Sequence, residues 1–447
     1  MKYQVIIIGG GPAGYTAAEV AGKAGLSVLL IEKNSLGGVC LNEGCIPTKT
    51  LLYSAKIYDN ARHASKYAVN VAEASFDLSK IICRKSKVVR KLVLGVKAKL
   101  ATNNVTILSG EARIIDKNTV RCGDETYEGE NLILCTGSET FIPPIKGIET
   151  VNYWTHRDAL DNKEILSSLV IVGGGVIGME FASFFNSLGV QVTVVEMMDE
   201  ILGGMDKELS ALLRTEYAKR GVKFLLSTKV VSLSQDGDLA VVCYENAEGS
   251  ESVVADKILM SVGRRPVTKG FGLENLEIER TERGNIKVNA QMQTSIPSVY
   301  ACGDLTGFSL LAHTAVREAE VAVHTILGKA DVMSYRAIPG VVYTNPEIAG
   351  VGETEESAST KAINYRIVKL PMAYSGRFVA ENEGVNGVCK ILLDECDRII
   401  GAHVLGNPAS EIIALAGTTI ELGLTAEQWK KIVFPHPTVC EIFREAL

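Results

Sequence analysis

Residues 5–14 read V-I-I-I-G-G-G-P-A-G, and residues 169–178 read L-V-I-V-G-G-G-V-I-G. In both segments an apolar run typical of a buried strand enters a glycine-rich turn, and a helical pattern and a second apolar strand follow. The second strand ends at an acid, Glu32 or Glu196, which follows the first glycine by 23 residues in both copies (32 − 9 and 196 − 173). This agreement between two distant segments predicts that one structural unit occurs twice.

The G-x-G-x-x-G spacing is typical of a turn that binds the pyrophosphate of a dinucleotide. Its first glycine permits the tight turn, its second lets the backbone approach the phosphates, and its third lets the helix lie against the sheet. The phosphates then lie at the helix N-terminus, where free N–H groups favour an anion, and the acid binds the ribose hydroxyls. We therefore predict two dinucleotide sites, which comprise Gly9, Gly11, Gly14 and Glu32 in the first copy and Gly173, Gly175, Gly178 and Glu196 in the second.

The residues after Glu196 indicate which nicotinamide dinucleotide the second site prefers. They are Met197, Met198, Asp199 and Glu200, with no arginine close by in the sequence to bind a 2′-phosphate. Carboxylates would repel that phosphate, so the sequence favours NAD over NADP at this site.

Length and composition limit the other functional classes. A chain of 447 residues is too long for one hydrophobic core and predicts about two to four domains. The net charge of −6 argues against a nucleic-acid-binding surface. The apolar run after Met1 is too short for a signal peptide, and no uninterrupted apolar stretch reaches the roughly 20 residues of a spanning helix. We therefore expect a cytoplasmic protein that binds neither nucleic acid nor membrane.

Cys40 and Cys45 stand out among the ten cysteines, because only four residues separate them and several glycines surround them. The segment 46–49 is predicted to begin a helix with Pro47 in its first turn. A thiol at a helix N-terminus near a lysine has a lowered pKa and reacts as the thiolate, so we interpret the pair as redox-active. A metal site would need further ligands, and no His or Cys pair nearby supplies them. The remaining cysteines, such as Cys135, mostly occur singly in apolar segments and are predicted to be small buried side chains.

Residues 37–49, G-G-V-C-L-N-E-G-C-I-P-T-K, resemble the active-site segment of the pyridine nucleotide–disulfide oxidoreductase family. Other segments resemble further motifs of that family in the expected order. Residues 261–266 resemble its exit from the NAD domain, residues 301–304 and 311–313 its second flavin contact, and residues 436–441 its interface-domain motif. Because these matches run almost from end to end, the sequence is identified as a member of that family.

The resemblance implies an α/β fold with two Rossmann-like dinucleotide-binding domains, for FAD and NAD, and an α+β C-terminal dimerisation domain. The first part of the FAD-binding domain is expected at 1–144, the NAD-binding domain at 145–265, the second, central part of the FAD-binding domain at 266–334, and the interface domain at 335–447. In this family the dimer completes the active site, so His436 of one subunit would face Cys40 of the other.

The resemblance also implies the roles of individual residues. Cys40 and Cys45 would form the redox-active disulfide, His436 would act as general base, and Glu441 would orient its ring. No metal is expected. Besides the two glycine turns, the residues expected to contact the cofactors are Lys49 with its partner Glu180, Ala112, Thr136, Gly137, Ser138, Asp304, Ala312, Val230 and Gly263.

Within the family the sequence is most similar to the NAD-dependent dihydrolipoamide dehydrogenases. This similarity implies a homodimer that acts on a lipoyl-bearing protein of a 2-oxoacid dehydrogenase or glycine-cleavage system. A glutathione-type flavin disulfide reductase is one alternative, although such enzymes generally use NADPH and carry arginines where this chain has residues 197–200. A docking subunit of a lipoyl-dependent complex is another, and the intact cysteine and histidine motifs argue against that as its sole role.

Overall fold

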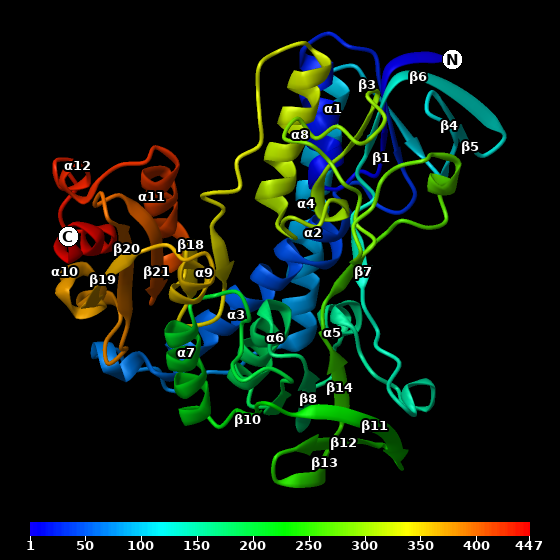
Figure 1. Cartoon of the computed structure of the whole chain (residues 1–447). Coiled ribbons are helices and arrows are strands. Elements are labelled where there is room, and N and C mark those ends of the chain that lie inside the picture. The colour runs from blue at the N-terminus through cyan, green and yellow to red at the C-terminus, as the bar shows by residue number, and fades with distance from the viewer. The chain divides into compact units, whose positions relative to one another are not determined.

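The computed structural model describes all 447 residues, which form two compact units built from separate chain segments. The first unit contains residues 1–48, 83–141 and 264–334, and the second contains residues 49–82, 142–263 and 335–447. Helices α3 (Cys45–Arg62) and α4 (Leu78–Thr102) each contribute residues to both units. Most of the helices and strands of both units are labelled in Figure 1.

The first unit is centred on a seven-stranded sheet of order β3-β2-β1-β6-β5-β4, in which β16 also pairs with β6. The central strand β1 is parallel to its neighbours, with Ile7 opposite Leu30 of β2 and Ile133 of β6. These three side chains are fully buried, which explains why the strands read as continuous apolar runs. The strand bounds are β1 (Lys2–Ile8), β2 (Val28–Glu32), β3 (Val105–Ser109), β4 (Ala112–Asp116), β5 (Thr119–Cys122), β6 (Glu125–Leu134) and β16 (Val299–Ala301).

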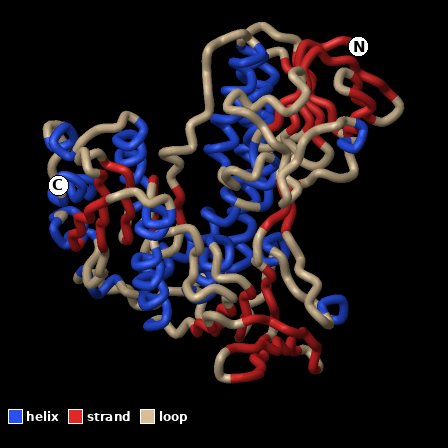
Figure 2. The backbone as a smooth tube through the Cα atoms, in the orientation of Figure 1, coloured by secondary structure: helices blue, strands red, loops and turns tan.

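Helices α1 (Pro12–Lys23) and α8 (Ala312–Ile326) pack side by side in the first unit (Figure 2). Most of the buried residues of α1 are small, such as Ala17 and Ala21, which allows the two helix backbones to approach closely. Pro12 occupies the first turn of α1, where its missing N–H costs nothing. Two short strands, β7 (Ser138–Thr140) and β15 (Arg264–Pro266), pair antiparallel in the same unit.

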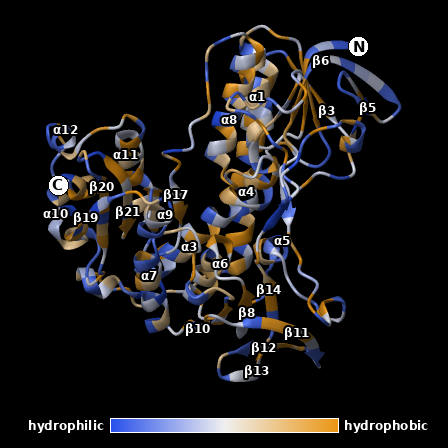
Figure 3. Ribbon diagram, in the orientation of Figure 1, coloured by the Kyte–Doolittle hydropathy of each residue, from blue (hydrophilic) through white to orange (hydrophobic).

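The second unit contains the other glycine-rich turn, in a parallel sheet of order β10-β9-β8-β14. Helix α6 (Val176–Ser187) follows the turn and buries the aromatic side chains of Phe181, Phe184 and Phe185. Because α6 is apolar on almost every side, it is buried rather than lying at the surface (Figure 3). The other elements of this part are β8 (Ser168–Val172), β9 (Gln191–Val195), β10 (Lys223–Leu225), β14 (Lys257–Met260), α5 (His156–Asp161), α7 (Lys207–Lys219) and a three-stranded sheet of β11 (Lys229–Asp236), β12 (Leu239–Asn246) and β13 (Gly249–Ala255).

The C-terminal part of the second unit is a five-stranded antiparallel sheet of order β17-β18-β21-β20-β19. Helix α11 (Ala409–Glu421) packs on it through buried residues such as Ile413 and Ala416. The strand bounds are β17 (Gly340–Val342), β18 (Ile348–Gly352), β19 (Tyr365–Pro371), β20 (Val388–Asp394) and β21 (Ile399–Leu405), and the other helices are α9 (Glu355–Thr360), α10 (Gly376–Glu381), α12 (Ala426–Lys430) and α13 (Ile442–Ala446).

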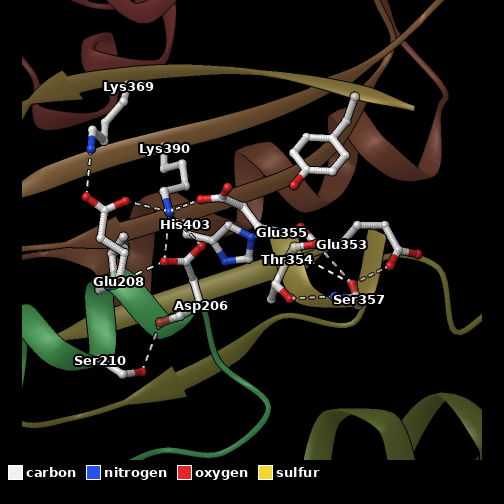
Figure 4. A network of polar contacts seen from close by, with 12 residues as sticks. Asp206, Glu208, Ser210, Glu353, Thr354, Glu355, Ser357, Lys369, Lys390 and His403 are labelled. Carbon is white, nitrogen blue, oxygen red and sulfur yellow. Dashed lines mark hydrogen bonds and ion pairs between the residues drawn. The ribbon is translucent and has the colours of Figure 1, made fainter. Parts of the chain in front are cut away.

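A buried charge cluster connects this antiparallel sheet to α7 (Figure 4). The ammonium of Lys390 on β20 lies 3.0 Å from Asp206, 2.7 Å from Glu208 and 2.7 Å from Glu355, and the Lys390 side chain is 1% exposed. Asp206 also caps α7 by accepting a hydrogen bond from the backbone N–H of Leu209. Burial alone would lower the pKa of Lys390, but its hydrogen bonds to the three carboxylates raise the pKa above its ordinary value.

The predicted α/β architecture with an α+β C-terminal part is therefore confirmed. The two strand–turn–helix–strand units lie where the sequence predicts them, from β1 to β2 and from β8 to β9. No helix of the structure is both long and apolar enough to cross a membrane.

Candidate active site

The first glycine-rich turn lies between β1 and α1 and has the geometry of a phosphate cradle. A Cβ on Gly9, whose φ is 102°, would lie 2.2 Å from the carbonyl oxygen of Cys135, and a Cβ on Gly14 would lie 1.7 Å from that of Gly9. Glycine at these two positions therefore permits the close contact of helix and strand. Around Gly11 the nearest atom to such a Cβ is the Cα of Gly38 at 3.8 Å, and no side chain caps α1. An open approach to uncapped N–H groups fits the pyrophosphate of FAD.

The second turn, between β8 and α6, repeats this geometry. A Cβ on Gly173, whose φ is 105°, would lie 2.5 Å from the carbonyl oxygen of Ser261, and one on Gly178 would lie 2.0 Å from that of Gly173. A Cβ on Gly175 would meet nothing within 4 Å, and no side chain caps α6. The free space at Gly175 and the uncapped helix fit the pyrophosphate of NAD.

The two predicted acids are held in the same way. One oxygen of Glu32 accepts a 2.6 Å hydrogen bond from the backbone N–H of Gly10, and one oxygen of Glu196 accepts a 2.6 Å bond from that of Gly174. The other oxygens accept from the backbone N–H groups two residues further on, at 2.7 and 2.8 Å. Each acid is therefore fixed at the carboxyl end of its strand beside the glycine turn, which is the position that a ribose-binding acid requires.

Tertiary structure places an arginine beside the second site that the sequence reading missed. Arg214 of α7 forms two hydrogen bonds to the carboxylate of Glu200, at 2.8 and 2.9 Å. Likewise, the ammonium nitrogen of Lys207 lies 2.5 Å from a carboxylate oxygen of Asp199. Because carboxylates already pair with both cations, neither is free to neutralise a 2′-phosphate, and the preference for NAD is retained.

Cys40 and Cys45 form a disulfide, with their Cα atoms 4.7 Å apart. Cys40 lies in the short helix α2 (Gly38–Glu43), and Cys45 is the first residue of α3. A Cβ on Gly38 would lie 2.6 Å from the Cα of Gly11, so the disulfide segment packs directly against the first glycine turn. Because Cys45 begins a helix, its thiolate would be stabilised by free N–H groups and the positive end of the helix dipole.

Lys49 forms the predicted ion pair with Glu180 of α6, at 2.9 Å. The Glu180 side chain is 4% exposed and also accepts a 3.1 Å hydrogen bond from the backbone N–H of Tyr343. The Lys49 ammonium lies 4.6 Å from the centroid of the Tyr343 ring. Tyr343 is a contact that the sequence reading did not find, and it fixes the lysine by a cation–π interaction in addition to the ion pair.

Ser138 and Asp304, two predicted cofactor contacts, are hydrogen-bonded to each other through the serine hydroxyl. The Nε of Arg264 donates to the Ser138 hydroxyl and its Nη2 donates to the Ser138 carbonyl, both at 2.7 Å. The fully buried carboxylate of Glu318 accepts a 2.6 Å bond from the N–H of Gly303 and so fixes the turn that carries Asp304. Glu318 lies in no motif that the sequence analysis named, and Arg264 lies in the segment 261–266, whose resemblance to a family motif did not predict its contact with Ser138.

Three further predicted residues lie in turns or at a helix start. Thr136 follows β6 and donates a 2.8 Å hydrogen bond to the carbonyl of Val267. Gly137 and Gly263 have φ values of 69° and 121°, which favour glycine. Ala312 is the first residue of α8, with no side chain capping that helix.

Ala112 and Val230 have a different environment from the other predicted contacts. The side chain of Ala112, at the start of β4, belongs to the apolar core of the first unit. The side chain of Val230, on β11, packs against an apolar core of the second unit. Their side chains therefore pack in apolar cores, and only the backbone at these positions would contact a cofactor.

Cys135 and Cys302 lie close together, although the sequence reading treated Cys135 as a single buried cysteine. They follow the paired strands β6 and β16, and the N–H of Cys302 donates a 3.0 Å hydrogen bond to the carbonyl of Leu134. Burial, the adjacent Cys135 thiol and Glu318 raise the pKa of the Cys302 thiol. Cys302 is therefore protonated near neutral pH and is a poor nucleophile.

His436 and Glu441 form the predicted pair, with Nδ1 of the imidazole 2.9 Å from a carboxylate oxygen. The other oxygen of Glu441 accepts a 2.8 Å hydrogen bond from the N–H of Thr438. That bond, and then the bond from His436, lower the pKa of Glu441, so the carboxylate stays ionised. The His436 side chain is 80% exposed within this single chain.

Comparison with known proteins decides the family. Residues 3–319 match the family model of the pyridine nucleotide-disulphide oxidoreductases, and residues 338–447 match that of their dimerisation domain. The chain belongs to this family. A dihydrolipoyl dehydrogenase of Thermus scotoductus is 41% identical over 99% of this chain and 96% of its own, and one of Geobacillus stearothermophilus is 38% identical over 100% and 96%.

Solved structures of the family agree with this assignment. LpdA of Mycobacterium tuberculosis superposes with a TM-score of 0.91 at 26% identity, covering 99% of this chain and 98% of its own. The HOCl-induced flavoprotein disulfide reductase RclA of Escherichia coli superposes with a TM-score of 0.88 at 30% identity, covering 99% of both chains. The predictions of a flavoprotein disulfide oxidoreductase with FAD and NAD as cofactors, similar to the dihydrolipoamide dehydrogenases, are confirmed.

Proposed function

We propose that this pyridine nucleotide–disulfide oxidoreductase oxidises protein-bound dihydrolipoamide to lipoamide with NAD+ as the final acceptor. The observation that carries the proposal is the Cys40–Cys45 disulfide. Cys45 begins helix α3, and the segment that contains the disulfide packs against the first glycine turn. The relatives named dihydrolipoyl dehydrogenase match almost the full length of the chain and indicate which dithiol it takes.

The chemistry at the disulfide is a balanced thiol–disulfide exchange. A thiolate of the dihydrolipoyl group attacks the sulfur of Cys40, the Cys40–Cys45 bond breaks, and Cys45 leaves as a thiolate. The second lipoyl thiolate attacks the sulfur now bound to Cys40, which closes the lipoyl disulfide and releases Cys40. The substrate has then lost two electrons and two protons, and the enzyme holds two reduced cysteines.

The chain's own residues prepare this exchange. In the proposed dimer His436 takes the proton of the attacking thiol, and the ionised Glu441 holds its Nδ1, so that Nε2 acts as the base. The first turn of α3 stabilises the departing Cys45 thiolate. Lys49, fixed by Glu180 and Tyr343, places a positive charge at the start of the same helix.

The two cofactors fit the two glycine turns. The first turn would hold FAD and the second NAD, and when bound they would supply the redox chemistry that takes up the electrons of the reduced cysteines. Glu32 and Glu196 would bind the riboses, and Ser138 and Asp304, which are hydrogen-bonded to each other, would contact FAD. Ala112, Thr136, Gly137, Ala312, Val230 and Gly263 complete the proposed contacts.

The domain arrangement, assembly and location follow from the same proposal. The FAD domain comprises residues 1–144 and 266–334, the NAD domain residues 145–265, and the interface domain residues 335–447. The chain carries the dimerisation domain of the family, which supports a homodimer. We place this dimer in the cytoplasm, with a lipoyl-bearing protein of a 2-oxoacid dehydrogenase or glycine-cleavage system as its substrate.

The proposal is tested by Cys45→Ser, with Cys396→Ser as the matched control because Cys396 is an exposed free cysteine. The purified wild type should be yellow, and stepwise reduction should add a long-wavelength thiolate-to-flavin band. C45S should lose this band and dihydrolipoamide turnover, and C396S should keep both. Full turnover by C45S would refute the proposal, and a strong preference for glutathione disulfide and NADPH would favour a glutathione-type reductase.

A further inference from the structure

Tyr343 contacts both members of the Lys49–Glu180 ion pair. Its backbone N–H donates a 3.1 Å hydrogen bond to Glu180, and the centroid of its ring lies 4.6 Å from the Lys49 ammonium. The ammonium nitrogen lies 2.9 Å from each oxygen of the same carboxylate. All three residues belong to the second unit. The lysine is therefore held between a carboxylate and an aromatic ring.

The position of the Tyr343 ring is fixed by the segment that carries it. Tyr343 directly follows β17, which packs against α6 (Figure 3). The N–H of Asn345 donates a 3.0 Å hydrogen bond to the hydroxyl of Tyr217, which itself bonds to Ser183 of α6 at 2.7 Å. Thr344 is 2% exposed. Because hydrogen bonds hold the backbone on both sides of a buried residue, the ring projects from a fixed main chain.

The Tyr343 side chain attracts Lys49 as a neutral ring. Burial, followed by the nearby carboxylates of Glu180, Glu347 and Glu411, raises the pKa of Tyr343. The phenol is therefore protonated near neutral pH, and it attracts the ammonium through its ring rather than as a phenolate. Glu180 is the only carboxylate within ion-pair distance of Lys49, whose side chain is 32% exposed. Without the ring, one ion pair alone would hold a partly exposed lysine.

Lys49 follows Cys45 by about one turn of α3. Side chains four residues apart lie on the same face of a helix, with their Cβ atoms about 5–6 Å apart. Helical side chains also lean toward the N-terminus, so Lys49 extends back toward Cys45, the first residue of the helix. A positive charge held there favours the thiolate over the thiol. A lysine that turns into water would favour it less, because the attraction weakens with distance and with the dielectric constant.

We propose that Tyr343 is a positioning residue, whose ring holds the Lys49 ammonium near the first turn of α3 and so favours the thiolate of Cys45. This inference rests on the proposed function, in which the exchange at Cys40 releases that thiolate. Tyr343 lies within residues 338–447, which match the dimerisation-domain model. A segment of the dimerisation domain would therefore influence the chemistry of the disulfide in its own chain.

The test compares Tyr343→Leu with Tyr343→Phe in the purified flavoprotein. After two-electron reduction, the long-wavelength thiolate-to-flavin band is measured as a function of pH, and its midpoint reports the ionisation of Cys45. Leucine removes the ring and keeps the backbone N–H that binds Glu180, so the midpoint of Y343L should rise by about 0.5–1 pH unit. Phenylalanine keeps the ring, so the midpoint of Y343F should stay within about 0.2 pH unit of wild type.

A second background shows whether Tyr343 acts through Lys49. Lys49→Met/Glu180→Gln removes both charges together, so that no buried carboxylate is left without its cation. Adding Tyr343→Leu to this background should not move the midpoint further, because no lysine is left to position. A merely structural role of the ring would lower the melting temperature and leave the midpoint of Y343L at the wild-type value.

Three results would overturn the inference. They are an unchanged midpoint in Y343L, an equal rise in Y343F, and a rise on adding Y343L to K49M/E180Q that is as large as in wild type. In each of these cases the reduced wild type still shows its thiolate-to-flavin band, so the proposed function stands without this role of Tyr343. A wild type that gains no such band on reduction would instead refute the proposed function.

Discussion

Replacing Gly175 by alanine adds one methyl group where the structure leaves space and where the proposed NAD pyrophosphate would approach. Gly175 has φ of −71° and ψ of −176°, which alanine adopts without strain. A Cβ there meets no atom within 4 Å. The folded chain should therefore tolerate the substitution, and the melting temperature should stay the same or rise slightly.

The ligand should not tolerate it. The methyl group would hold the phosphates away from the N-terminal N–H groups of α6, and a hydrogen bond to a charged group contributes about 1.5–3 kcal/mol. Loss of one such bond corresponds to roughly 10- to 150-fold weaker binding of NAD+. Titration of NADH binding and the rate at which NAD+ reoxidises the reduced enzyme would measure this change, with flavin content as the check on the first site.

Gly178→Ala is the matched contrast. Its Cβ would lie 2.0 Å from the carbonyl oxygen of Gly173, so backbone must move and the protein should lose about 1–3 kcal/mol of stability or more. G178A should therefore melt at a lower temperature than G175A. If G175A binds NAD+ as tightly as wild type, the pyrophosphate does not lie at this turn and the assignment of the second site is wrong.

Three other substitutions give separate tests. His436→Gln should lower dihydrolipoamide turnover by about 10²- to 10⁴-fold while electron transfer from NADH to the flavin is retained, and an unchanged rate would exclude a general base at this position. Lys390→Met leaves the carboxylate of Asp206, which is 2% exposed, without its cation and should lower the free energy of unfolding in urea by about 3–5 kcal/mol. Lys369→Met breaks a pair whose side chains are 48% and 40% exposed and should lower it by less than about 1 kcal/mol. Equal urea midpoints for the two variants would contradict this prediction. Asp331→Asn should destabilise the protein, because hydrogen bonds from Arg317 lower the pKa of Asp331 despite its partial burial. A carboxylate whose pKa is lower in the folded than in the unfolded chain stabilises the protein at pH values above the unfolded pKa of 3.8. The difference in unfolding free energy between wild type and D331N should therefore be constant near neutral pH and shrink below about pH 4. A difference that grows in acid would contradict this prediction.

The sequence by itself determined the features that depend on local spacing. The two glycine turns, the acids that follow them and the disulfide between Cys40 and Cys45 all have partners at short, fixed separations along the chain. Steric limits on a strand–turn–helix leave so few solutions that residue type and spacing define the local backbone. The pair of His436 and Glu441, five residues apart, follows instead from the resemblance of residues 436–441 to a family motif.

Tertiary structure decided the contacts between segments that the sequence separates. Tyr343 reaches Glu180 across 163 residues, and Arg264 reaches Ser138 across 126. The proximity of the free thiols of Cys302 and Cys135 depends on β16 lying next to β6. Such pairs have no period or spacing of their own, because they follow from the order of strands in a sheet and from the packing of one layer on another.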